Sequence, residues 1–110
     1  MQQWSIRSAW GLLSALSLAF PAAADISAGK TEADMACAGC HGAQGVATLP
    51  NAPNLAGQSQ IYLVEQLKNY RSGKRTHEVM GVIAKPLTDQ EIKNTSAWYA
   101  SLQMELRESK

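Results

Sequence analysis

The chain has 110 residues, a length that suits one domain. Its 10 Lys and Arg residues are balanced by 9 Asp and Glu residues, so the formal net charge is only +1. This balance excludes a polybasic nucleic-acid-binding protein, and a hydrophobic share of 45% argues against a disordered acidic tail. We therefore expect one folded domain that does not bind nucleic acid.

The first 24 residues have the three-part layout of a secretory signal peptide. Arg7 lies in an opening stretch without acidic residues, an apolar run spans 9–20, and Pro21 is followed by three alanines. The apolar run is well short of the ~20 residues that a membrane-spanning helix needs. We expect cleavage after Ala24 and a mature domain of residues 25–110 without a stable membrane span, and an uncleaved membrane anchor is the alternative. A domain this small lies near the lower limit for a self-sufficient core, so a group other than side chains is expected to fill its middle.

Two helices are expected in the first half of the mature domain. The first runs from Thr31, which can cap it, to about Gly39. The second spans 59–72 and is followed by Gly73, a residue type common just beyond a helix C-terminus. The apolar residues of the second helix recur at helical spacing: Ile61, Leu63, Val64, Leu67 and Tyr70.

A third helix is expected to begin at a T-x-x-E capping box made by Thr88 and Glu91. No segment alternates apolar and polar residues as a strand does, so the sequence predicts an all-α fold. Long irregular connections cover 42–57 and 73–87, and connections of that length in a small domain usually carry function. The apolar face of the third helix comprises Ile92, Trp98, Tyr99, Leu102 and Leu106.

The two cysteines of the chain, Cys37 and Cys40, are followed directly by His41. A C-x-x-C pair alone is compatible with a thioredoxin-like redox pair, half of a zinc site or a disulfide. A zinc site needs further ligands, and a redox pair needs a βαβ context that this sequence lacks. C-x-x-C-H in an exported chain instead favours covalent haem attachment. Positions i, i+3 and i+4 face one side of a helical turn, so both thiols can reach haem vinyl groups while the imidazole reaches the iron.

The run MACAGCHGAQG at 35–45 resembles the haem-binding segment of class I c-type cytochromes. PNLAG at 53–57, YRSGKR at 70–75 and VMGVIAKPLTD at 79–89 resemble one bacterial branch of that family. The branch includes small periplasmic carriers, the halves of two-haem cytochromes and the haem subunits of sulfide-oxidising flavocytochromes. The resemblance covers essentially the whole mature chain, and it implies a small all-α bundle wrapped around one haem, with the first and last helices crossing.

A six-coordinate iron needs a ligand on the face opposite His41. Met35 lies too close to His41 in the sequence to reach that face, and Met104 is expected at the end of the last helix as packing material. Met80, in the second long connection, coincides with the methionine position of the family and is the expected distal ligand, with His77 as its rival. His/Met ligation raises the reduction potential relative to bis-histidine sites.

The resemblance also assigns roles around the iron. It implies that the backbone carbonyl of Pro53 accepts a hydrogen bond from His41 and that Leu55 packs on the haem. Tyr70 and Trp98 are interpreted as packing aromatics. Four basic residues that precede the Met80 segment form either a solvated helix end or a docking rim for an acidic redox partner: Lys68, Arg71, Lys74 and Arg75.

These observations predict a periplasmic single-haem c-type cytochrome that passes single electrons between redox partner proteins and is not itself an enzyme. The first alternative is the haem subunit of an oxidoreductase, such as a sulfide dehydrogenase flavocytochrome with a flavoprotein partner. The second is an enzyme or gas sensor with an open iron, which follows if Met80 does not bind.

Overall fold

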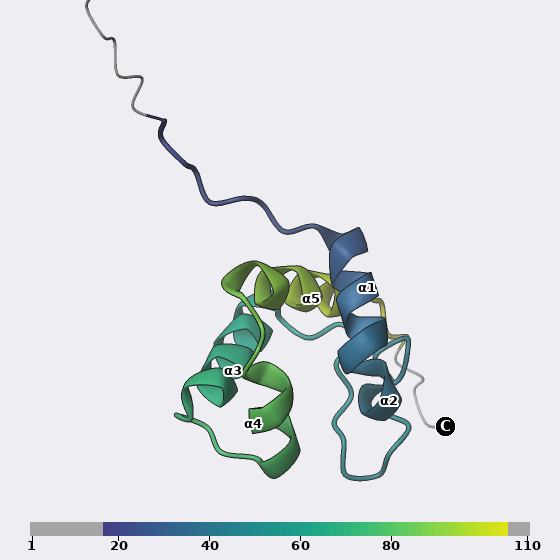
Figure 1. Cartoon of the computed structure of the whole chain (residues 1–110). Helices are drawn as coiled ribbons and strands as arrows, with labels where there is room; N and C mark the ends of the chain where they lie inside the picture. Colours follow the sequence, from purple (N-terminus) through teal and green to yellow (C-terminus); the bar gives the residue numbers. More distant parts are fainter. Residues whose placement is uncertain (1–16, 106–110) are drawn as a thin grey trace, which may run out of the picture.

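The computed structural model describes residues 17–105, and within them the chain forms five helices and no strand, as the predicted all-α fold requires (Figure 1). Residues 1–16 of the expected signal peptide and Leu106 of the expected last helix lie outside the described residues. No helix between residues 17 and 105 is long and apolar enough to cross a membrane. The helices are α1 (Ile26–Ala36), α2 (Ala38–His41), α3 (Gln60–Ser72), α4 (Glu78–Ala84) and α5 (Asp89–Ser101).

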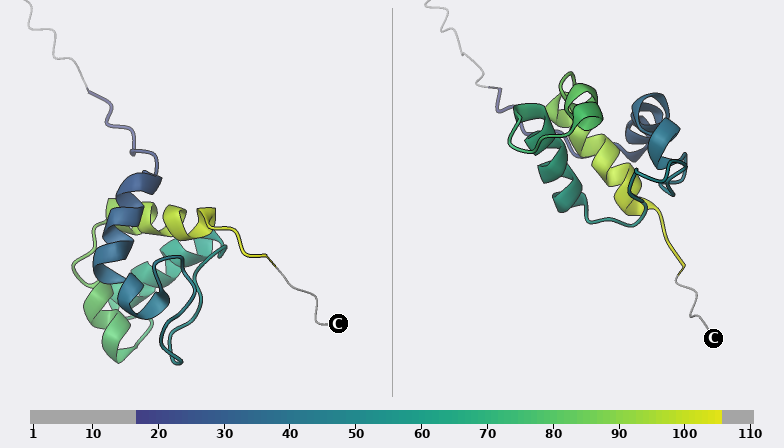
Figure 2. Two further views of the ribbon diagram at one scale, coloured as in Figure 1. Left: turned by 90° about the vertical axis from the view of Figure 1, so that its right-hand side faces the viewer. Right: turned by 90° about the horizontal axis from the view of Figure 1, so that it is seen from below.

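The helices form two groups that α5 joins. Figure 1 shows α1 and α2 on one side and α3 and α4 on the other, with α5 running between them, and the view from below in Figure 2 shows the same separation. Helix α5 packs extensively on both α1 and α3, whereas α4 packs mainly on α3. The connection 42–57 returns the chain from α2 to the start of α3 (Figure 1).

The first helix begins five residues earlier than predicted. Asp25 is its N-cap and accepts a hydrogen bond from the amide of Ala28 at 3.0 Å, while Thr31 lies inside the helix and bonds the carbonyl of Ser27. Gly29, which weakens a helix in isolation, is buried where α1 crosses α5. A Cβ at this position would lie 2.9 Å from the backbone nitrogen of Thr95 and closer still to the Asn94 carbonyl. The glycine is therefore explained by the crossing.

The second and third expected helices are present with the predicted caps. Ser59 caps α3, Gly73 ends it in the left-handed conformation, and Thr88 and Glu91 form both hydrogen bonds of the capping box on α5. Ile61 does not belong to the packed face of α3, because it is 82% exposed. Helix α5 ends at Ser101, so Leu102 is its C-cap.

Helix α4 lies within residues 73–87, where the sequence predicted an irregular connection, so that prediction is wrong for this segment. His77 is its N-cap, and its Nδ1 accepts hydrogen bonds from the amides of Val79 and Met80, both at 3.2 Å. Histidine is an uncommon N-cap, and a helix of seven residues shows little periodicity, so neither usual signal marks the segment. Met80 therefore sits on a helix and not in a loop.

The side-chain core of the described residues is small. Its buried hydrophobic residues are four alanines and three larger side chains, namely Leu63, Ile92 and Tyr99. Cys37, Leu55, Trp98 and Leu102 pack against this core while remaining partly exposed. So small a core agrees with the expectation that another group occupies the middle of the domain.

Candidate functional site

A cavity of about 460 Å³ lies between the two groups of helices, and every helix contributes to its wall. Its surface is mostly apolar. The volume falls in the range of ligand and cofactor sites. All six residues singled out from the sequence line this one cavity: Cys37, Cys40, His41, Pro53, Leu55 and Met80.

The C-x-x-C-H segment folds as the short helix α2. The amide of His41 bonds the carbonyl of Cys37 at 3.0 Å, which turns the two cysteines and the histidine to one side. Gly42 then reverses the chain with φ 79°, where a Cβ would overlap the carbonyl oxygen of Val46. This turn leaves His41 buried at the cavity wall.

A hydrogen bond fixes the ring of His41. Its Nδ1 lies 2.8 Å from the carbonyl oxygen of Pro53. Since a carbonyl can only accept, Nδ1 carries the proton and donates, and Nε2 keeps its lone pair. This tautomer can bind a metal through Nε2, and a bond from the other ring nitrogen to a carbonyl is the usual support of a ligating histidine.

The connection that presents Pro53 is braced by its own hydrogen bonds. The carbonyl of Gly45 accepts from the amides of Leu55 and Ala56 at 2.8 and 3.1 Å. Asn54 accepts from the amide of Ala47 through Oδ1 at 2.8 Å. These bonds fold the connection back on itself, so the Pro53 carbonyl reaches the imidazole from a defined position.

The thiols of Cys37 and Cys40 are free and are not joined in a disulfide. Burial raises the pKa of the Cys37 thiol to about 11, so this group is protonated at neutral pH. A redox-active cysteine is instead exposed and has a lowered pKa. In the described part of the chain, no three His, Cys, Asp or Glu side chains are grouped so that they could hold a metal ion.

Two hydroxyl groups on α5 face the same cavity. Ser96 Oγ and Tyr99 Oη are buried and make no hydrogen bond of good geometry among the described residues, although Tyr99 Oη lies beside the Cys37 thiol. Buried polar atoms are rarely left unpaired unless another group lies against them. Together with the two free thiols, the available imidazole nitrogen and the small core, these hydroxyls show that the cavity fits haem c.

The wall opposite α2 includes α4 and the end of α3. Met80 and His77 both line the cavity there. Of the three methionines within residues 17–105, Met35 is 77% exposed and Met104 is 47% exposed, and neither lines the cavity. Met104 follows the end of α5 and is not the packing residue that we expected.

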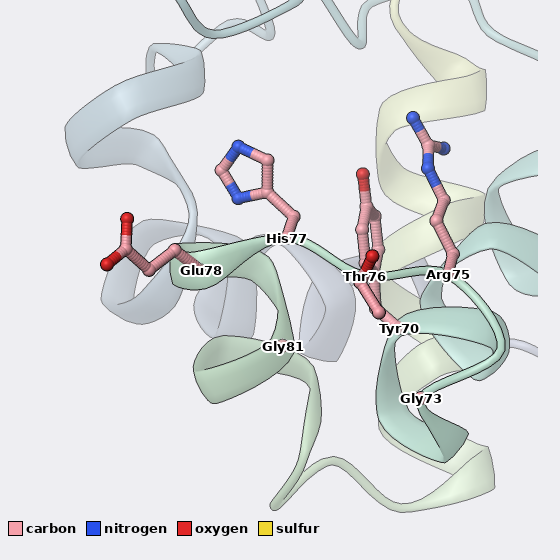
Figure 3. Close-up of a pocket in the computed structure, with 7 residues that line it drawn as sticks. All are labelled: Tyr70, Gly73, Arg75, Thr76, His77, Glu78 and Gly81. Atoms are coloured by element: carbon pink, nitrogen blue, oxygen red, sulfur yellow. The ribbon is translucent and has the colours of Figure 1, made fainter.

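A shallow open pocket adjoins the cavity at the α3–α4 connection, and Figure 3 shows that Tyr70, Arg75 and His77 project to the same side of it while Glu78 points away. The Arg75 guanidinium lies 4.6 Å from the centre of the Tyr70 ring and donates to Gln66 Oε1 at 2.8 Å. Tyr70, which we interpreted as a packing aromatic, is part of the cavity wall.

The four basic residues before α4 are not all free for docking. Arg71 pairs with Asp89 and donates to the carbonyl of Leu87, so it ties α3 to the start of α5. With Arg75 held against Tyr70, two of the four cations are engaged within the domain. Sequence reasoning missed these contacts, because they join residues that only the tertiary fold brings together.

Comparison with known proteins agrees with this site. The chain is 42% identical over 83 residues to a cytochrome c4 of Thiocapsa roseopersicina, an alignment that covers 76% of this chain and 43% of that protein. It is 38% identical over 82 residues to cytochrome c-554(548) of Halomonas halodenitrificans, with 72% of this chain and 98% of the relative covered. The chain therefore spans less than half the length of the cytochrome c4 relative but nearly all of the second protein.

Among solved structures, the thiosulfate dehydrogenase of Marichromatium purpuratum superposes with a TM-score of 0.68 at 36% identity, covering 72% of this chain and 19% of that chain. The family model for cytochrome c matches residues 26–103, from the first residue of α1 to just beyond α5. The C-x-x-C-H turn, the cavity that fits haem and this match lead to one conclusion: the chain belongs to the cytochrome c family, whose members carry covalently bound haem c.

Proposed function

We propose that the protein is an exported electron carrier with one haem c, which passes single electrons between redox proteins in the periplasm. The observation that carries this proposal is the single cavity lined by Cys37, Cys40, His41 and Met80. The two cysteines supply the thioether links, His41 is the proximal iron ligand and Met80 is the distal one. The nearly full coverage of the single-domain-sized relative supports a one-haem protein.

The assignment of Met80 rests on a comparison with its rival. His77 already uses Nδ1 to cap α4, with two backbone amides at 3.2 Å, and turning the ring toward iron would disturb that cap. The side chain of Met80, unlike its backbone amide, takes part in none of the hydrogen bonds among the described residues, and thioether sulfur is a ligand that suits haem iron. The buried imidazole of His41 and the Met80 side chain then reach the iron from different walls of the cavity.

When bound, haem c supplies a one-electron couple whose potential depends on its axial ligands and surroundings. The residues of this chain tune that couple. Pro53 holds the ring of His41 through the bond to Nδ1, which increases the donor strength of Nε2. The apolar wall, including Leu55, limits access of water. If His41 and Met80 both bound the iron, no site would be left open for a substrate, and electron transfer would be the chemistry that the group supplies.

Export is part of the same proposal. Thioether formation to C-x-x-C-H fits a chain that is moved out of the cytoplasm, and the first 24 residues have the layout of a signal peptide. Removal of that segment after Ala24 leaves the mature domain of residues 25–110 in the periplasm. Mass spectrometry of the exported protein tests this directly, because the expected mass is that of the mature chain plus one haem.

The spectrum of the purified holoprotein tests the ligands. Oxidised protein should show the weak long-wavelength band of sulfur-bound ferric haem, and Met80→Ala should remove it and open the iron to carbon monoxide or cyanide. His77→Ala should keep the band. If His77→Ala and not Met80→Ala removes the low-spin spectrum, the distal ligand is histidine. If the unmodified protein already binds carbon monoxide, the open-iron alternative is correct.

The second candidate function is that of a haem domain in an oxidoreductase complex. The observation that favours it is the likeness to part of a thiosulfate dehydrogenase structure. A permanent subunit buries an apolar interface, whereas a carrier binds briefly through a small interface steered by charge. The contacts of α3 limit which charges can steer a partner: Lys68 and Lys74 are exposed and have no ion-pair partner within the described residues.

An ionic-strength series distinguishes the two candidates. For a carrier, the rate of electron transfer from its native donor should fall as salt rises, and Lys68→Glu and Lys74→Glu should lower the rate at low salt. Lys85→Glu, an exposed lysine outside the cluster, is the matched control for the change of charge. Purification in a fixed ratio with a partner and a rate insensitive to salt would instead favour the subunit.

A further inference from the structure

Asp25 joins an extended leader to the folded domain. Residues 17–24 form no helix or strand, and 17–23 are exposed. Helix α1 starts at the next residue after Asp25, whose side chain caps it. Figure 2 shows the leader departing from the domain at the start of α1. The bond between Ala24 and Asp25 thus lies where irregular chain meets the first helix.

The backbone nitrogen of Asp25 has a partner on α5. It donates to Oδ1 of Asn94 at 2.9 Å, and Asn94 is only 5% exposed. The same Oδ1 accepts a second hydrogen bond from Nε2 of Gln90 at 2.8 Å. Because Gln90 holds the side-chain amide of Asn94 in place, the oxygen that accepts from the Asp25 nitrogen is oriented independently of Asp25.

Asn94 contacts α1 at a second point, one helical turn away. Its backbone carbonyl lies where a Cβ on Gly29 would have to go, so α1 and α5 touch backbone to backbone there. The side chain of Asn94 holds Asp25 while its main chain packs on Gly29. One residue of α5 therefore fixes both the start and the middle of α1.

We propose that this site binds the α-amino group that Asp25 acquires when residues 1–24 are removed. The inference rests on the proposed signal cleavage. Hydrolysis of the Ala24–Asp25 bond consumes one water and leaves a carboxylate on Ala24 and an ammonium on Asp25. The donor nitrogen keeps its place and gains a positive charge, so its hydrogen bond to Asn94 becomes charge-assisted. The carboxylate of Asp25 offsets the unfavourable placement of that charge at a helix N-terminus.

Cleavage also removes two contacts that the leader makes with α5. Gln90 Nε2 donates to the carbonyl of Ala23 and Lys93 Nζ donates to the carbonyl of Ala22, both at 3.1 Å. After cleavage Gln90 retains its bond to Asn94 alone. Before cleavage, a neutral amide and two exposed leader carbonyls contact α5. After cleavage, one charged nitrogen donates to the buried side chain of Asn94.

The experiment compares two holoproteins that differ only at the N-terminus. One begins at Asp25, and the other begins at Ala22, produced by moving the signal so that cleavage leaves three extra residues. Each is made with Asn94, Asn94→Asp and Asn94→Leu, and urea unfolding gives the folding equilibrium constants. Gln44→Glu, at an exposed residue of the 42–57 connection, controls for added negative charge.

A carboxylate at residue 94 can form an ion pair with an ammonium, whereas with an amide N–H it can form only a hydrogen bond. We expect Asn94→Asp to raise the folding constant of the Asp25 form about three- to fivefold relative to its effect on the Ala22 form. Asn94→Leu should lower the folding constant of the Asp25 form more than that of the Ala22 form. Equal effects of both substitutions on the two forms would overturn the proposal. The mass of the natural exported chain reports separately on cleavage, so a different natural N-terminus would refute the export proposal while the engineered pair still tests amine binding.

Discussion

Replacing Gly29 by alanine tests whether the α1–α5 crossing determines the fold. In a helix that faces solvent, the change from glycine to alanine stabilises by roughly 0.5–1 kcal/mol. Here the added Cβ would meet the backbone nitrogen of Thr95 at 2.9 Å and the carbonyl of Asn94 at a shorter distance. Backbone atoms cannot move aside as a side chain can, so the two helices must separate. Overpacking of this kind costs typically 1–3 kcal/mol.

The upper end of that range applies, because the obstructing atoms are all backbone. After subtracting the gain in helix propensity, we expect Gly29→Ala to lower the free energy of unfolding by about 2 kcal/mol. In a domain of this size that corresponds to a fall of roughly 10 °C in the melting temperature. The assay is thermal and urea unfolding of the holoprotein, followed by far-UV circular dichroism.

Gly81→Ala is the matched control for the glycine change. Gly81 also lies inside a helix, but a Cβ there would have no atom within 4 Å, so this change should stabilise the protein by roughly 0.5–1 kcal/mol. The two substitutions are chemically identical, and we expect them to change the free energy of unfolding in opposite directions. If Gly29→Ala also stabilises the protein, the close approach of α1 and α5 is refuted.

Three further predictions concern the caps and the braced connection. Hydrogen bonds to Thr88 lower the pKa of Glu91, so the contribution of this carboxylate to stability is present above its ordinary pKa of 4.5 and is lost as pH falls through the lowered value. Glu91→Gln should therefore flatten the fall in melting temperature between neutral pH and pH ~3. His77→Ala should lower the free energy of unfolding by about 1 kcal/mol through loss of the α4 cap, and calorimetry showing no change would contradict this. Asn54→Ala removes the acceptor for the Ala47 amide and should cost about 1 kcal/mol; by loosening the Pro53 carbonyl it should also raise the midpoint potential, which electrochemistry measures against Gln44→Ala.

The parts of the fold that depend on neighbouring residues were predictable. The capping box of Thr88 and Glu91 and the stop at Gly73 are local signals, and α5 begins and α3 ends where these signals indicate. The start of α1 was missed because two residue types are misleading there: Thr31 is a common N-cap and Gly29 weakens a helix. The true N-cap is Asp25, and the close contact with α5 explains why a glycine lies inside the helix.

In the candidate site, too, residues marked by a local sequence motif were predicted, and residues brought together by the tertiary fold were missed. Cys37, Cys40 and His41 lie within five residues of the sequence, so their chemistry could be predicted without a structure. The role expected of Pro53 came from a resemblance, and that of Met80 from a resemblance and from elimination of the other methionines. The unpartnered hydroxyls on α5 were missed. Ser96 and Tyr99 lie three residues apart on one helical face, and a serine within the apolar stripe was the signal that could have found them.

The braced 42–57 connection has a consequence for the speed of electron transfer. Gain or loss of an electron would change the charge of the bound haem iron, and every nearby group that shifts in response adds to the reorganisation energy of electron transfer. The carbonyl that holds the His41 ring belongs to a segment closed by bonds to Gly45 and anchored to α5 through the amide of Gly57 and the carbonyl of Tyr99, 2.9 Å apart. As the proximal ligand that we propose, His41 would move little between the two charge states, which would keep the reorganisation energy low and electron transfer fast.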